Sequence, residues 1–149
     1  MLAASATSSP AREGNGDVAV VIDRLSKHFG SAPALQDLSA QIRYGRLTGL
    51  VGPDGAGKTT LMRILTGLLV PNSGHARVAG FDVVDDNDAI HVATGYMPQR
   101  FGLYEDLSVM ENMRLYAQLR GMAADGHADL FAQLLDFTRL APFTGRLAG

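Results

Sequence analysis

Residues 52–60 read GPDGAGKTT, with three glycines in the first six positions and a lysine directly after the last. Glycine loses more backbone entropy on folding than any other residue, so a stretch this rich in glycine needs a structural or chemical reason. The stretch follows a short apolar run at residues 47–51 and precedes a segment with helical spacing of apolar residues. A flexible turn between a strand and a helix commonly holds a phosphate group.

The spacing of Gly52, Gly57, Lys58 and Thr59 fits the P-loop pattern G-x-x-x-x-G-K-[ST]. The pattern arises by chance in a chain of this length with a probability of roughly one percent, so a ligand-free glycine turn is the weaker alternative. Lys58 is predicted to reach the β- and γ-phosphates, and the Thr59 hydroxyl to bind Mg²⁺. The predicted nucleotide-binding residues are Gly52, Pro53, Asp54, Gly55, Ala56, Gly57, Lys58, Thr59 and Thr60.

The segments that flank the loop predict a strand and a helix. The apolar run at residues 47–51 is typical of a buried parallel strand. Leu61, Ile64, Leu65 and Leu68 recur at i, i+3, i+4 and i+7, which gives a helix one apolar face. The turn-forming residues 71–74 should stop this helix. The sequence therefore predicts an α/β fold in which the glycine-rich loop joins a strand to a helix.

Composition narrows the class of protein. The chain has 149 residues, 46% of them hydrophobic, which suits a single domain with its own core. A formal net charge of −2 gives no basic surface for nucleic acid, and the absence of cysteine excludes disulfides and thiolate metal sites. No apolar run approaches the roughly 18 to 20 residues of a membrane helix. We expect the small, polar residues 1–17 to form a disordered tail.

The remaining elements are predicted from apolar periodicity and turn signals. Strands are expected at residues 18–25 and 35–42, before the loop, and at 92–97. Residues 75–83 should form a strand pair that turns at Ala79 and Gly80. Ser108 and Glu111 form a capping box that should start a helix running to a stop at Gly121, and a second helix is expected at about residues 128–137.

Four stretches together resemble the first half of the ATP-binding cassette of an ABC transporter. They are KHFG at 27–30, GPDGAGKTTLMRILTGLL at 52–69, SGHARVAGFDV at 73–83 and GYMPQRFGLYEDLSVMENM at 95–113, the last resembling bacterial export and drug-resistance cassettes. The resemblance implies a P-loop NTPase core to about residue 100 with an N-terminal antiparallel β subdomain. From about residue 101 it implies the start of a helical subdomain.

The resemblance also implies ligands, partners and residue roles. Phe29 matches the aromatic residue that stacks on adenine, although a loop aromatic packed on the core is the alternative. Gln99 matches the glutamine that helps to hold Mg²⁺ and the attacking water, which makes it a metal and catalytic candidate. The implied cofactors are ATP and Mg²⁺. The implied partners are a membrane-spanning transporter subunit and a second cassette, with the chain on the cytoplasmic face of the inner membrane and no nucleic acid bound.

Three motifs that hydrolysis needs in this family are missing from the 149 residues. They are an L-S-G-G-[QM] signature, an apolar strand ending in Asp-Glu, and a later switch histidine. The sequence ends TRLAPFTGRLAG, which in this family leads into the signature, so we expect a truncated cassette. Two alternatives to a transporter ATPase subunit stay open: a nucleotide-binding module without hydrolysis, and a non-transport ABC protein. The resemblance also implies that the membrane subunits, and not the cassette, select the transported substrate.

Overall fold

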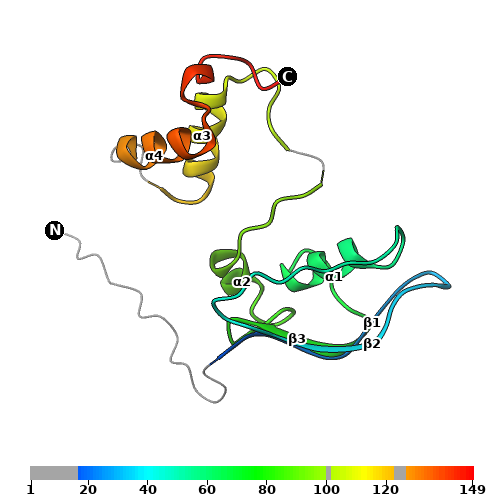
Figure 1. Cartoon of the computed structure of the whole chain (residues 1–149). Helices are drawn as coiled ribbons and strands as arrows, with labels where there is room; N and C mark the ends of the chain where they lie inside the picture. Colours follow the sequence, from blue (N-terminus) through cyan, green and yellow to red (C-terminus); the bar gives the residue numbers. More distant parts are fainter. Residues whose placement is uncertain (1–16, 100–101, 123–126) are drawn as a thin grey trace. The chain divides into compact units, whose positions relative to one another are not determined.

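The computed structural model describes residues 17–99, 102–122 and 127–149. The chain divides into two compact units, Met1–Tyr96 and Met97–Gly149 (Figure 1). Residues 1–16, most of the expected disordered tail, lie outside the described residues. The longest helices in the described ranges have 11 residues, and none is long and apolar enough to cross a membrane.

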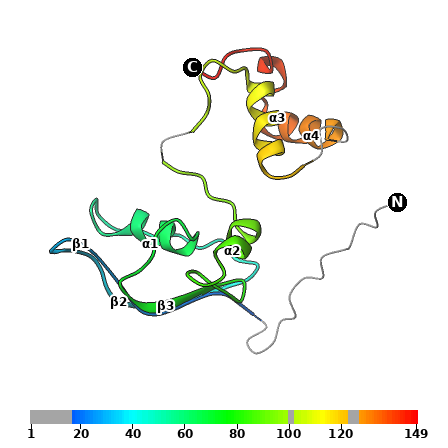
Figure 2. The ribbon, with the colours of Figure 1, turned by 180° about the vertical axis from the view of Figure 1, so that it is seen from behind.

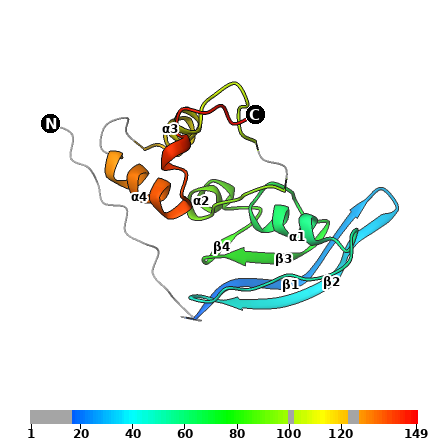
Figure 3. The same ribbon diagram turned by 45° about the horizontal axis from the view of Figure 1, so that its top comes forward.

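The first unit contains a four-stranded antiparallel sheet with the order β2-β1-β3-β4 (Figure 3). Its strands are β1 (Val18–Phe29), β2 (Ala32–Arg43), β3 (Ser73–Val78) and β4 (Phe81–Asp82). The first two confirm the strands predicted before the loop and extend each of them, because the β1–β2 hairpin pairs as far as Phe29 with Ala32. The predicted turn at Ala79 and Gly80 is also confirmed, with φ of 53° and 89°.

Helices α1 (Lys58–Leu65) and α2 (Asn87–Ala93) lie on the same face of this sheet (Figure 2). Leu61, Ile64 and Leu65 of α1 are buried, as the apolar periodicity predicted. They join Ile90 of α2 and buried residues of β1, β2 and β3 in one hydrophobic core. This core fixes α1, and therefore the loop that precedes it, against the sheet.

Helix α1 ends one turn earlier than the apolar periodicity suggested. Gly67 has φ of 71°, its N–H donates to the Ile64 carbonyl at 3.0 Å, and the Leu68 N–H donates to the Arg63 carbonyl at 2.8 Å. These two bonds form a Schellman motif, which closes a helix through a left-handed glycine. Leu68 therefore lies beyond the helix and is exposed.

Two predicted strands are absent, so both predictions were wrong. Residues 47–51 are irregular, and the side chains of Leu47 and Val51 are fully exposed. A strand needs a hydrogen-bonded neighbour, and no described strand pairs with this run. Residues 92 and 93 belong to α2, and residues 94–97 are irregular. Ile90 anchors this helix in the core, whereas the Val92 side chain faces solvent.

The second unit contains α3 (Val109–Leu119), α4 (Ala128–Thr138) and the short 3₁₀ helix η1 (Ala141–Phe143). Both predicted helices are confirmed. The capping box at the start of α3 is present in full: the Ser108 hydroxyl accepts from the Glu111 N–H, and the Glu111 carboxylate accepts from the Ser108 N–H. Gly121, with φ of 74°, follows the end of α3 as expected.

Candidate functional site

The glycine-rich loop is fitted tightly against the start of β2. Gly57 has φ of 82°, and a Cβ built on it would lie 2.2 Å from the Ala34 carbonyl oxygen and 2.9 Å from a methyl carbon of Leu35. Only glycine tolerates both this backbone conformation and this proximity. Gly55 also has a positive φ, 80°, but its missing side chain would point into open space. Gly57 thus allows the loop to pack against β2, whereas Gly55 allows the backbone of the loop to turn.

The N-terminus of α1 is open toward solvent. Its N-cap is Gly57, no side chain caps it, and its first turn contains no acidic residue. The first N–H groups of a helix have no acceptor within the helix and carry the positive end of its dipole. Loop and helix together therefore present backbone donors and partial positive charge, which is the environment that binds an anion such as phosphate.

Lys58 adds a full positive charge to this loop. Its ammonium group donates hydrogen bonds to the carbonyl oxygens of Gly52 at 2.7 Å and Pro53 at 2.6 Å. The side chain therefore folds back across the loop instead of extending into solvent. An ammonium group has three donors, and these two bonds use two of them.

Thr59 and Thr60 occupy the first turn of α1, where Thr59 is exposed and Thr60 is half-buried. The exposed Thr59 hydroxyl is a hard oxygen ligand of the kind that Mg²⁺ prefers. The described residues contain no group of three or more histidine, cysteine or acidic side chains that could hold a metal ion.

Phe29 lies at the end of β1, outside the hydrophobic core, with 54% of its surface exposed. This exposure argues against the alternative of a core-packed ring. Phe29 pairs with Ala32, two residues before the Ala34 carbonyl against which Gly57 is docked. Phe29 and Gly57 of the P-loop therefore both contact the first three residues of β2.

Gln99 is exposed at a bend in the second unit. The structure groups the P-loop and Phe29 within the first unit, whereas Gln99 belongs to the other. Sequence reasoning overlooked Lys27, whose ammonium group lies 5.6 Å from the centre of the Phe29 ring. The predicted strand ended at residue 25, so the sequence analysis did not place Lys27 and Phe29 on one strand; the observed β1 continues to Phe29.

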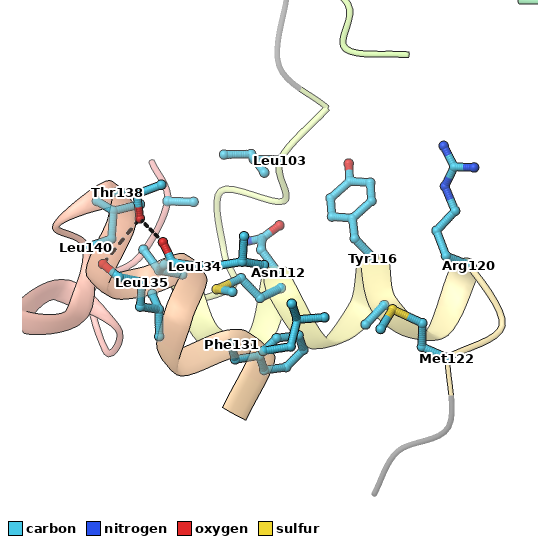
Figure 4. A pocket seen from close by; sticks show the side chains of 15 residues that line it. Leu103, Asn112, Tyr116, Arg120, Met122, Phe131, Leu134, Leu135, Thr138 and Leu140 are labelled. Atoms are coloured by element: carbon cyan, nitrogen blue, oxygen red, sulfur yellow. Dashed lines mark hydrogen bonds between the residues drawn. The ribbon is translucent and has the colours of Figure 1, made fainter. Parts of the chain in front are cut away.

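The second unit contains a cavity of about 550 Å³ between α3 and α4 (Figure 4). Its lining is almost entirely apolar and includes Met113, Phe131 and Leu134. A triphosphate needs a concentration of donors and positive charge that this cavity does not offer. The candidate site is therefore the P-loop in the first unit.

Comparison with known proteins agrees with this geometry. The family model described as ABC transporter matches residues 35–147. The chain is 56% identical over 135 residues to the probable multidrug ABC transporter ATP-binding protein YbhF of Escherichia coli, covering 89% of this chain and 23% of that protein. It is 36% identical over 130 residues to the daunorubicin resistance ATP-binding protein DrrA3 of Streptomyces coeruleorubidus, covering 87% of this chain and 41% of the relative.

A solved structure of an ATP-binding subunit of an ABC transporter superposes with a TM-score of 0.75 at 26% sequence identity. That superposition covers 87% of this chain and 54% of the subunit, which confirms the predicted fold class. The chain thus spans less than half the length of the two relatives named above. Because the family model covers most of its residues, the chain belongs to the ABC transporter family.

Proposed function

We propose that this chain binds ATP through the P-loop at residues 52–60 and forms part of the ATP-binding subunit of an export-type ABC transporter. The observation that carries the proposal is the docked loop with Lys58 folded across it, at the open N-terminus of α1. Membership of the ABC transporter family supports it, as do relatives whose names describe ATP-binding proteins of multidrug or drug-resistance systems.

Each group in the site has a task in this proposal. Backbone N–H groups at the end of the loop and in the first turn of α1 hold phosphate oxygens, and Lys58 neutralises charge on the β- and γ-phosphates. Phe29 stacks on the adenine ring from the end of β1. The protein's contribution to phosphoryl transfer is positioning and electrostatic stabilisation.

Mg²⁺ fits this site as a cation that arrives with the nucleotide. Thr59 would supply its hydroxyl oxygen, with phosphate oxygens and water as further ligands, and Gln99 is proposed as a ligand from the family resemblance alone. Mg²⁺ commonly keeps several waters and uses few protein ligands alongside substrate phosphates, which is compatible with so sparse a set. When bound, the ion supplies charge neutralisation on the phosphates.

For coupling to transport, the proposed partners are a membrane-spanning transporter subunit and a second ATP-binding cassette, on the cytoplasmic face of the membrane. Nucleic acid is not proposed, because the net charge of −2 offers no basic surface. A nucleotide-binding module that does not hydrolyse ATP is the second candidate.

The proposal is tested by calorimetric titration of the 149-residue chain with ATP and with adenosine, each with and without Mg²⁺. We expect ATP to bind and adenosine, which has no phosphate, to bind far more weakly. Equal affinity for both would contradict a phosphate-binding loop. Phosphate release from ATP separates the two candidates: release that disappears in a Lys58→Ala variant shows a working ATPase, whereas binding without release favours the module.

A further inference from the structure

The end of β1 carries a lysine and an aromatic ring that are in contact. The Lys27 ammonium group lies over the Phe29 ring, 5.6 Å from its centre. The same ammonium group donates a 2.7 Å hydrogen bond to the carbonyl oxygen of Val70, which follows α1 in the chain. Lys27 thus joins the exposed ring to the segment that leaves the P-loop helix.

Neighbouring hydrogen bonds fix the backbone on which this contact depends. The His28 N–H donates to the Asn72 side-chain oxygen at 2.8 Å, and the Asn72 N–H donates to the Ser26 carbonyl at 2.9 Å. On the other side, the Asp37 N–H of β2 donates to the Ser26 hydroxyl at 2.9 Å. The backbone on both sides of Lys27 is therefore anchored, and the hydrogen bond to the Val70 carbonyl holds the ammonium group itself near the ring.

A cation held near the face of an aromatic ring is attracted by the ring's negative electrostatic potential. The attraction restrains a half-exposed side chain that would otherwise sample several rotamers. A planar base can then stack on the ring's opposite face and lose less entropy than it would against a mobile ring. The contact prepares Phe29 for stacking before the nucleotide arrives.

We propose that Lys27 is a positioning residue, which orients Phe29 for stacking on the purine base of a nucleoside triphosphate. This inference rests on the proposed function, since it needs ATP to bind at the P-loop. The inference predicts which ligands are affected. Replacing Lys27 should lower the affinity for ligands that carry a base and should not change the affinity for the phosphate chain alone.

The chain contains no tryptophan, so a Phe29→Trp change gives a single fluorescent reporter at the stacking position. Tryptophan also forms the strongest cation–π contacts, so the reporter preserves the feature under test. In this background we would compare Lys27→Met, Lys27→Arg and Arg24→Met. Arg24 lies on the same strand with an exposed side chain paired to Asp23, and its replacement removes one charge without touching the ring. The ligands are ATP and tripolyphosphate, which has no base.

We expect Lys27→Met to weaken ATP binding by about two- to five-fold, the size of an exposed cation–π contact. Lys27→Arg should restore the affinity, Arg24→Met should leave it unchanged, and tripolyphosphate affinity should be equal in all four proteins. Unchanged ATP affinity in Lys27→Met would overturn the inference. So would an equal loss for ATP and tripolyphosphate, or an equal loss in Arg24→Met. If the unmodified chain binds no ATP in calorimetry, the proposed function itself fails.

Discussion

Gly57 and Ala34 are in backbone contact: a Cβ placed on Gly57 would lie 2.2 Å from the Ala34 carbonyl oxygen, too close for any side chain. This contact holds the last turn of the glycine-rich loop on the β1–β2 hairpin. The hairpin also carries Phe29, paired with Ala32. The β1–β2 hairpin therefore positions both the loop and the proposed base-stacking ring, and a substitution at Gly57 should disturb both.

Gly57→Ala should destabilise the chain and abolish ATP binding. The new methyl group meets backbone atoms that cannot move aside, and alanine is strained at φ of 82°. Gly55→Ala is the matched control, because it shares the positive φ but has open space around it. We expect a loss of unfolding free energy of about 1 kcal/mol for Gly55→Ala and clearly more for Gly57→Ala. Equal losses in urea denaturation would show that the contact with Ala34 is unimportant.

Phe29→Ala should weaken ATP binding by about 1 to 2 kcal/mol, because a base would lose its stacking surface. Mg²⁺ dependence should remain, since no proposed ligand of the ion changes. The melting temperature should change little, as the ring is half-exposed and lies outside the core. The opposite pattern in calorimetry and thermal melting, unchanged affinity with a lower melting temperature, would mean that the ring is structural.

Asn112→Ala should destabilise the second unit. Asn112 is only 3% exposed; its side-chain oxygen accepts from the Tyr104 N–H, and its amide donates to the carbonyls of Tyr104, Leu107 and Ser108. The three carbonyls keep backbone donors of their own, but the Tyr104 N–H loses its acceptor, at a cost of about 1 to 3 kcal/mol. Hydrogen exchange at the Tyr104 amide should accelerate. Gln118→Ala, at an exposed position of the same helix, should have little effect, and equal effects of the two changes would contradict this role.

Glu111 should make the stability of α3 dependent on pH. Hydrogen bonds from the Ser108 side chain and backbone lower the pKa of Glu111 below its ordinary value of 4.5. A carboxyl whose pKa is lower in the folded state adds stability above the unfolded pKa and loses it as pH falls through the folded pKa. The difference in unfolding free energy between the parent and Glu111→Gln should therefore shrink as pH drops below about 4.5. A difference that does not vary between pH 7 and pH 3 would contradict this.

Local patterns predicted several elements of this structure. The capping box of Ser108 and Glu111 and the hairpin at Ala79 and Gly80 each depend on a few neighbouring residues, whereas the end of α1 at Gly67 was not predicted. Such elements can be predicted from sequence because their hydrogen bonds close within a short segment. The apolar face of α1 was also predictable, since its periodicity reports burial directly.

The strand predicted at residues 47–51 depended instead on a distant partner. An apolar run indicates that burial is favoured, but it does not indicate which strand would provide the hydrogen-bonded neighbour. Lys27 was missed for a related reason. Its role depends on the Val70 carbonyl, 43 residues away in sequence, and no pattern in the sequence reveals that contact.

The central claim is that the loop at residues 52–60 binds the phosphates of ATP with Lys58 as its charged group. The most direct test is the ATP affinity of Lys58→Ala beside Arg63→Ala, which removes one positive charge from an exposed position of the same helix. We predict that Lys58→Ala abolishes detectable ATP binding with secondary structure retained by circular dichroism, while Arg63→Ala binds like the parent. Equal ATP affinity in the Lys58→Ala variant and the parent chain would contradict the account.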